Sequence, residues 1–249
     1  MIELVQPPAA LDLAATAAGG LTGGLFAVSR GIPATGLLAV TVANAFGGGV
    51  LRDLLLGRTP PVALQEPRYL VVAAACAAVC FFLGAVVARM QRLVDLVDAV
   101  GTALFAVVGA STALAAGVAP VPAVLIGATN AIGGGVLRDV IGGVTPDISR
   151  PGPISGFAGV VTAVAYVVGR RGVDLPVPAA LWVAVVLGVA LRMLGVWRGT
   201  HAPAPVDLTL PLRARVRRTL PPGRSPLGAG LPPRIRDLRR RRGGSTRRP

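Results

Sequence analysis

Apolar residues gather into seven long runs, separated by short polar stretches. The runs cover residues 9–29, 34–56, 69–89, 94–117, 120–142, 153–169 and 177–197. Crossing the hydrocarbon core of a bilayer takes about 20 helical residues at roughly 1.5 Å each. The stretches between the runs hold Gly, Pro and Arg, as turns do. The pattern predicts an all-α integral membrane protein with seven transmembrane helices.

Composition agrees with a membrane protein, and the charge is unevenly placed. Of the 249 residues, 53% are hydrophobic and only 14% are charged, which is too apolar for an average soluble domain. The net charge of +14 divides into +2 for residues 1–197 (11 Arg, 9 Asp or Glu) and +12 for residues 198–249 (14 Arg, 2 Asp). We expect that tail to be disordered and attracted to anionic lipid. It has no aromatic residue to stack on bases, so no specific nucleic-acid partner is expected.

The first six runs contain an internal duplication. Shifting the chain by 86 residues without a gap aligns residues 12–60 with residues 98–146, with 18 identities over 49 positions. The densest identity is between NAFGGGVLRD at 44–53 and NAIGGGVLRD at 130–139. Nine matches within ten positions indicate duplication rather than shared composition.

Each copy holds three spans, and this odd number makes the second copy enter the membrane from the opposite side. We therefore predict an inverted 3+3 repeat, an arrangement known from transport proteins, followed by a seventh span. The expected divisions are residues 9–92 and 93–173 for the two repeats, 174–197 for the seventh span, and 198–249 for the tail.

The repeated motif places three glycines inside the second and fifth spans. Each glycine weakens a helix by about 1 kcal/mol relative to Ala, so a kink or a break is expected there. Freed backbone groups at membrane depth are tolerated only inside protein or along a watery cavity. Close helix packing is the competing explanation for glycines alone. The glycines concerned are Gly47, Gly48, Gly49, Gly133, Gly134 and Gly135.

Two ionisable residues follow each glycine block. Arg52 with Asp53, and Arg138 with Asp139, are charges that cost free energy at membrane depth unless they have partners or water. Adjacent helical residues do not face each other, so we expect pairing across the two copies. The hypothesis is that Arg52 meets Asp139 and Arg138 meets Asp53, or that all four share water in a central cavity.

Two further carboxylates begin the repeats. Asp12 and Asp98 are expected in the first turns of the first and fourth spans, where a carboxylate favours the helix dipole. A place at a pore mouth is an equally good interpretation. No catalytic residues, metal ligands or cofactor motif stand out: His201 is alone in the tail, and the glycine block lacks the Lys-Ser/Thr of a phosphate loop. The sequence predicts a protein that is not an enzyme.

Arginines near the span ends set the expected orientation. The loops on the two sides of the membrane carry almost equal numbers of arginines. The basic tail therefore decides for an outside N-terminus and a cytoplasmic C-terminus. The predicted location is the inner membrane of a bacterial cell, crossed several times.

The doubled Gly-Gly-Gly-x-x-Arg-Asp motif, the three-span repeats that begin at an Asp and the seventh span resemble the bacterial members of the trimeric intracellular cation (TRIC) channel family over residues 9–197. The resemblance implies a homotrimer with one pore per subunit, passing K⁺ or another monovalent cation along the kinked second and fifth spans. It makes the six motif glycines and Arg52, Asp53, Arg138 and Asp139 the pore and gating residues, without a cofactor.

Two other functions remain open. The same family has also been described as carrying glycine, so one alternative is a secondary transporter of a small zwitterion. The other is a non-conducting membrane scaffold that acts through its basic tail. An unpaired Arg would repel K⁺ by roughly 4 kcal/mol at 4 Å with an effective dielectric constant near 20. A cation channel therefore requires these arginines to be paired, or to block a closed state.

Overall fold

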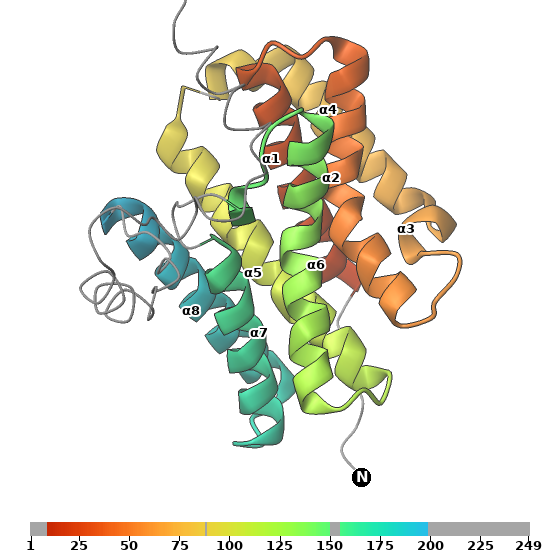
Figure 1. Cartoon of the computed structure of the whole chain (residues 1–249), viewed down its shortest axis with the longest axis vertical. Helices are drawn as coiled ribbons and strands as arrows, with labels where there is room; N and C mark the ends of the chain where they lie inside the picture. The colour runs from red at the N-terminus through yellow and green to blue at the C-terminus, as the bar shows by residue number, and fades with distance from the viewer. Residues whose placement is uncertain (1–8, 88, 150–154, 199–249) are drawn as a thin grey trace, which may run out of the picture. The chain divides into compact units, whose positions relative to one another are not determined.

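The computed structural model describes residues 9–87, 89–149 and 155–198, and this part of the chain is entirely helical. Its elements in order are α1 (Ala9–Ser29), α2 (Ala34–Leu55), α3 (Val62–Gln65), α4 (Pro67–Val87), α5 (Gln91–Ala115), α6 (Pro120–Ile141), the 3₁₀ turn η1 (Asp147–Ser149), α7 (Ser155–Arg171) and α8 (Val177–Arg198) (Figure 1). The basic tail that the sequence places at 198–249 lies outside the described residues from 199 onward.

All seven predicted spans correspond to long helices, so the prediction of an all-α membrane protein is confirmed. Six of the described helices are long and apolar enough to cross a membrane: α1, α2, α4, α5, α6 and α8. The remaining long helix, α7, has 17 residues, at the short end of what spans a bilayer. The short elements α3 and η1 were not predicted.

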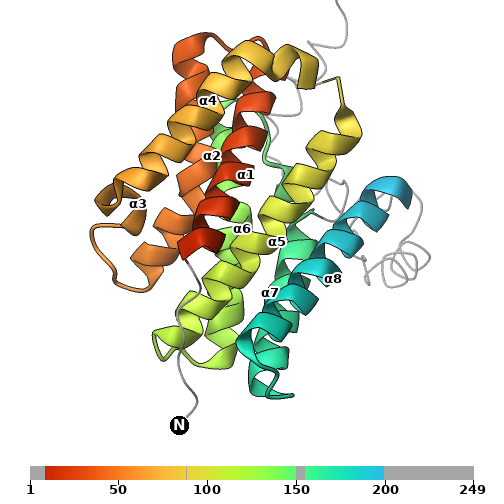
Figure 2. The same cartoon turned by 180° about the vertical axis from the view of Figure 1, so that it is seen from behind.

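The helices surround α5 and α6. Helix α6 packs against α2, α5 and α7, while α1 packs against α2, α4 and α5. Helices α4 and α8 lie on opposite sides of the bundle, as the front and back views both show (Figures 1 and 2). Helix α5 is buried without interruption from Ala103 to Leu114. A helix that is apolar all round belongs inside a bundle, and α5 is the shared core of this one.

Large apolar side chains remain exposed on the outer helices. Phe82 of α4 is 77% exposed, and Trp182 and Trp197 are exposed near the two ends of α8. Hydrocarbon chains are as apolar as these residues, and tryptophans prefer membrane interfaces. The exposed apolar surface is thus that of a protein in lipid.

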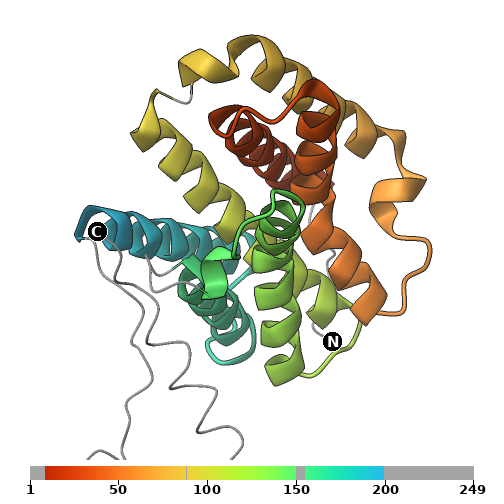
Figure 3. The ribbon, with the colours of Figure 1, turned by 45° about the horizontal axis from the view of Figure 1, so that its top comes forward.

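Helices α2 and α6 run through their glycine blocks without a break, so of the expected kink or break the break is wrong. The glycines instead bring the two helices together, side by side in Figure 3. A Cβ on Gly47 would lie 3.0 Å from the Cα of Gly134. A Cβ on Gly48 would collide with the carbonyl oxygen of Asn130, and one on Gly134 with that of Asn44. Close packing between helices accounts for these glycines.

Candidate functional site

Equivalent side-chain hydrogen bonds in the two copies tie α2 and α6 to neighbouring helices. The Asn44 side-chain amide donates to the carbonyl oxygen of Gly19 at 2.6 Å, linking α2 to α1. The Asn130 amide donates to the carbonyl oxygen of Phe105 at 2.6 Å, linking α6 to α5. Both pairs are 25 residues apart, and both are buried. Each glycine-containing helix is therefore tied to the first helix of its own copy.

In the first copy, Arg52 is surrounded by acceptors. Its Nε donates to Oδ1 of Asp53 at 2.8 Å, and its Nη1 donates to both carboxylate oxygens of Asp12 at 3.2 Å. The hydroxyl of Tyr69 donates to Asp12 at 3.0 Å. The Arg52 side chain is only 4% exposed. The sequence prediction that Asp12 lies in the first turn of its helix is confirmed, and its carboxylate neutralises Arg52.

The motif aspartates also hold the backbone that follows their helices. The second carboxylate oxygen of Asp53 accepts from the backbone N–H of Val62 at 2.9 Å, where α3 begins. The corresponding oxygen of Asp139 accepts from the N–H of Asp147 at 3.0 Å, where η1 begins. Each motif aspartate therefore holds the following loop in place as well as pairing with its arginine.

In the second copy, Arg138 bonds its neighbour and one loop residue. Its Nε donates to Oδ1 of Asp139 at 2.9 Å, and its Nη2 lies 3.7 Å from a carboxylate oxygen of Asp147. The ring of Phe26 covers the guanidinium at 4.9 Å from the ring centre, a favourable cation–π distance. Arg138 is more open than Arg52, with its side chain 13% exposed.

The predicted cross-copy pairs, Arg52 with Asp139 and Arg138 with Asp53, are wrong. Each arginine pairs with the aspartate next to it in its own motif. The helical spacing rule concerns Cβ positions, but the long Arg side chain folds back so that its Nε reaches the neighbouring carboxylate. The glycine contact between α2 and α6 leaves the two motifs at separate places, each beside its own loop.

Asp98 differs from its first-copy counterpart Asp12. Helix α5 begins at Gln91, so Asp98 lies about two turns inside it rather than in the first turn, and that expectation is wrong. Its carboxylate forms an ion pair with Arg192 of α8 and not with Arg138. The sequence analysis did not single out Arg192. An arginine inside the last apolar run was the available signal, because ionisable residues within spans usually have a function.

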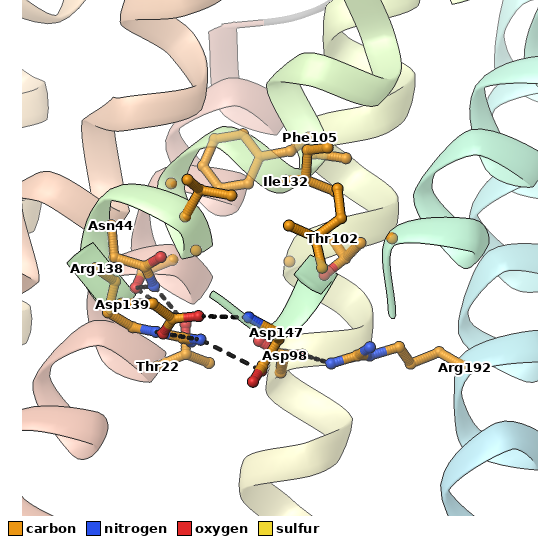
Figure 4. Close-up of a pocket in the computed structure, with 18 residues that line it drawn as sticks. Thr22, Asn44, Asp98, Thr102, Phe105, Ile132, Arg138, Asp139, Asp147 and Arg192 are labelled. Atoms are coloured by element: carbon orange, nitrogen blue, oxygen red, sulfur yellow. Dashed lines mark hydrogen bonds and ion pairs between the residues drawn. The ribbon is translucent and has the colours of Figure 1, made fainter. Parts of the chain in front are cut away.

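These second-copy charges line an open cavity. Two adjoining hollows of about 80 and 250 Å³ share six lining residues, and together we call them the charged cavity. The shared residues are Thr22, Asp98, Arg138, Asp139, Asp147 and Arg192. Figure 4 shows Arg138 and Arg192 reaching in from opposite sides toward the aspartates. Gly134 and Gly135 of the motif line it too.

The first-copy motif has only a small hollow beside it. That hollow measures about 10 Å³ and is lined by residues that include Asp12, Gly49, Arg52 and Tyr69. Such a volume is at the lower limit for one water molecule. The copies are thus equivalent in sequence but differ in the space beside them: the first motif adjoins a hollow of about 10 Å³, and the second adjoins the much larger charged cavity.

The charged cavity has side chains of both charge signs on its wall. Among the described residues, no group of three His, Cys, Asp or Glu side chains is placed to hold a metal ion. The cavity presents carboxylates and guanidinium groups together, which can attract a cation or the two ends of a zwitterion. Arg138 lies in the last turn of α6, and ionisable residues within membrane spans usually have a function.

Comparison with known proteins places this geometry in a family. The family model described as "Glycine transporter" matches the chain twice, over residues 9–85 and 95–171. Together these segments make up more than half of the chain. The chain belongs to this family. Each match to the glycine transporter family covers one of the glycine-containing helices, α2 or α6, with its neighbours.

Relatives within the curated proteins are membrane proteins. A UPF0126 membrane protein of Deinococcus radiodurans is 37% identical over 138 residues, which cover 55% of this chain and 64% of that protein. The chain thus spans slightly under two thirds of that relative. A UPF0126 inner membrane protein of Escherichia coli is 28% identical over 187 residues, covering 75% of this chain and 90% of that protein.

Solved structures of TRIC channels share the fold. The trimeric intracellular cation channel orthologue from Rhodobacter sphaeroides is 33% identical, with a TM-score of 0.72, over 77% of this chain and 98% of that one. A second TRIC cation channel is 28% identical, with a TM-score of 0.70, over 80% of this chain and 97% of that one. The resemblance to bacterial TRIC channels is confirmed. These relatives are channels and membrane proteins, in agreement with the prediction of a protein that is not an enzyme.

Proposed function

We propose that this protein is a homotrimeric channel for monovalent cations such as K⁺, with one pore in each subunit beside the glycine blocks of α2 and α6. The observation that carries the proposal is the charged cavity, which places Gly134, Gly135, Arg138 and Asp139 along one polar hollow inside a membrane bundle. The similarity to solved TRIC cation channels supports the ion and the trimer.

Pairing of the arginines removes an electrostatic objection to this proposal. A bare guanidinium would repel a cation, but Arg52 and Arg138 each lie within 3 Å of a motif carboxylate oxygen. Asp98 and Asp147 add further negative charge to the cavity. The carboxylates of the charged cavity are available to attract a cation once their arginine partners move aside.

We propose that this conformation is a closed one, because the tightly packed first-copy cluster leaves little space beside it. Asp12, Arg52, Asp53 and Tyr69 form a compact hydrogen-bonded group with space for at most one water molecule. An ion entering the charged cavity would stop there. We propose that opening separates Arg52 from Asp12, and that Arg52 with Gly49 and Arg138 with Gly135 form the two ends of the path.

The loops at the cavity give it a side of the membrane once the orientation of the N-terminus is assumed. The larger hollow is lined by Ser29 and Arg30 at the end of α1, by Gln91 at the start of α5 and by Val144 after α6. These loops face the cytoplasm if the N-terminus is outside, as the Arg-rich tail favours. We propose an inner membrane protein of a bacterial cell whose charged cavity opens to the cytoplasm and whose tail contacts anionic lipid. The divisions at 92/93 and 173/174 remain the proposed repeat boundaries.

Purified protein in planar bilayers tests the channel. Discrete single-channel currents in symmetric KCl, with a reversal potential that follows the K⁺ gradient, are the expected result. Arg138→Ala should change the unitary conductance, and Arg171→Ala, an exposed charge at the end of α7 that lines neither hollow, should leave it unchanged. Bilayers that stay silent with folded protein would overturn the channel.

A transporter of a small zwitterion such as glycine is the second candidate. The description of the family model and the presence of both charge signs in the charged cavity favour it. The unequal space beside the two motifs is also compatible with alternating access, in which one side of the site opens at a time. Saturable counterflow of radiolabelled glycine in liposomes, without current, is the result that would select it over the channel. If neither current nor counterflow is observed, the non-conducting scaffold is the function that remains.

A further inference from the structure

The second copy has exchanged an ion-pair partner that the first copy retains. In the first copy Asp12 binds Arg52, and the 86-residue shift makes Asp98 and Arg138 the equivalent residues. Asp98 instead binds Arg192, which α8 supplies from outside the repeat. Arg138 is left with Asp139 and Asp147. The seventh long helix therefore adds a cation to the charged cavity that the duplicated part does not contain.

Arg192 is held by less than Arg52 is. Arg52 uses Nε and Nη1 in bonds to two carboxylates, whereas Nε and Nη1 of Arg192 are buried without a hydrogen-bond partner among the described residues. Its Nη2 alone contacts Asp98. A guanidinium with most of its donors unused is the weaker partner of its carboxylate. The Asp98–Arg192 pair is therefore held by fewer hydrogen bonds than the Asp12–Arg52 pair.

Backbone packing fixes where Arg192 can reach. Gly188, one turn before it and therefore on the same face of α8, packs against Thr162 of α7 and Ala103 of α5, where a Cβ would collide with the Thr162 hydroxyl. Helix α8 is held close enough for the Arg192 side chain to cross to α5. Figure 4 shows the side chain extended from α8 toward Asp98.

We propose that Arg192 is a tethered competitor for permeating cations, which occupies the Asp98 carboxylate and must be displaced for a cation to bind in the charged cavity. The inference rests on the proposed channel. Asp98 is a partly exposed carboxylate, 26% open, on the cavity wall, and a free monovalent cation and the Arg192 guanidinium seek the same oxygens. Arg192 thereby sets how much K⁺ is needed to fill the pathway.

Single-channel conductance against K⁺ activity tests this. Arg192→Gln should lower the half-saturating K⁺ concentration by about fivefold, because it removes the cation that competes with K⁺ for the Asp98 carboxylate. Partly buried charges are screened little by salt, so the effect should persist as the KCl concentration is raised. Arg192→Lys, which keeps the charge, should stay near wild type. Asp98→Asn should raise the half-saturating concentration. Arg198→Gln removes the same charge from an exposed position on α8 that lines neither hollow, and should have no effect.

The outcomes separate this inference from the channel itself. Wild-type protein without K⁺ current overturns the proposed channel, and this inference with it. Wild-type current together with equal half-saturation for Arg192→Gln and Arg192→Lys overturns this inference alone. Each variant is compared only if it elutes from size-exclusion chromatography at the wild-type volume. A K⁺-dependent rise in melting temperature that is larger in Arg192→Gln than in wild type supports the same conclusion without requiring conduction.

Discussion

At the scale of single residues, glycines and charges of the repeated motif have separate roles. Gly48 and Gly134 give room to the carbonyl oxygens of Asn130 and Asn44, so their value lies in the absence of a side chain. Gly49 is different, because a Cβ there would meet only the Arg52 guanidinium at 3.9 Å. The arginines and aspartates, by contrast, neutralise one another and fix the following loops.

This difference predicts unequal effects of adding one methyl group. Gly48→Ala should destabilise the protein by about 1–3 kcal/mol, because the new Cβ overlaps a backbone oxygen that cannot rotate away. The melting temperature in detergent should fall by about 2–4 °C per kcal/mol. Gly49→Ala is the matched control, and its helix propensity favours a small gain. Equal melting temperatures for both variants would contradict the packing role.

At the scale of helices, one glycine positions the added helix. Gly188 allows α8 to contact α7 at Thr162, which is fully buried and bonds back to the carbonyl oxygen of Ala158 at 2.7 Å. That back-bond stays within α7, so the hydroxyl is not needed to join the two helices. The contact is steric, and its effect is to set the reach of Arg192.

A double-mutant cycle tests this contact. Gly188→Ala should destabilise by about 1–3 kcal/mol because its Cβ overlaps the Thr162 hydroxyl. Thr162→Ala removes that oxygen and should recover part of the loss when the two are combined, giving a positive coupling. Thermal melting of the wild type, both single variants and the double variant supplies the four values. Strictly additive changes would mean that these two side chains do not meet.

The sequence predicts elements better than partners. Apolar run length located all seven long helices, and the 86-residue shift located the two motifs. Both signals can be read directly along the sequence, without knowledge of the fold. The ion-pair partner of a charged residue depends on the fold: Arg52 pairs with Asp12 because α1 brings that carboxylate beside it. The start of α5 at Gln91 also moved Asp98 inward, since Arg92 and Asp95 are helical despite their charge. Arg192 was missed because it lies in a span without a repeat.

At the scale of the whole molecule, the described bundle is asymmetric although its motifs are duplicated. The charged cavity adjoins the second motif, while the first has a hollow of about 10 Å³ beside Asp12, Arg52 and Tyr69. Helix α8, which is outside the repeat, contributes a charged residue on one side only. The two ends of a pathway built on this bundle are therefore unequal in charge and in access.

Cysteine labelling in inside-out and right-side-out vesicles tests that asymmetry. The buried native cysteines, Cys76 and Cys80, are first replaced by Ala. Thr22→Cys, in the charged cavity, should react with a membrane-impermeant thiosulfonate applied from the cytoplasmic side. Thr16→Cys, at a buried position beside the small hollow of the first motif, should react from neither side. Fast labelling of Thr16→Cys from outside would mean that the first motif is open at rest.

The contact between α2 and α6 has a further consequence for how this chain evolves. Each helix offers its partner the same surface, a glycine beside an asparagine carbonyl, so the contact is isologous, as in a two-fold symmetric dimer. A larger residue at position 48 or at position 134 meets an equivalent obstacle, the carbonyl oxygen of Asn130 or of Asn44, and these two asparagines are 86 residues apart along the chain. Fusion of the copies left their ion pairs free to differ, as the Asp12–Arg52 and Asp98–Arg192 pairs do. The crossing itself remains constrained, because each helix must still accommodate the glycine and asparagine surface of the other.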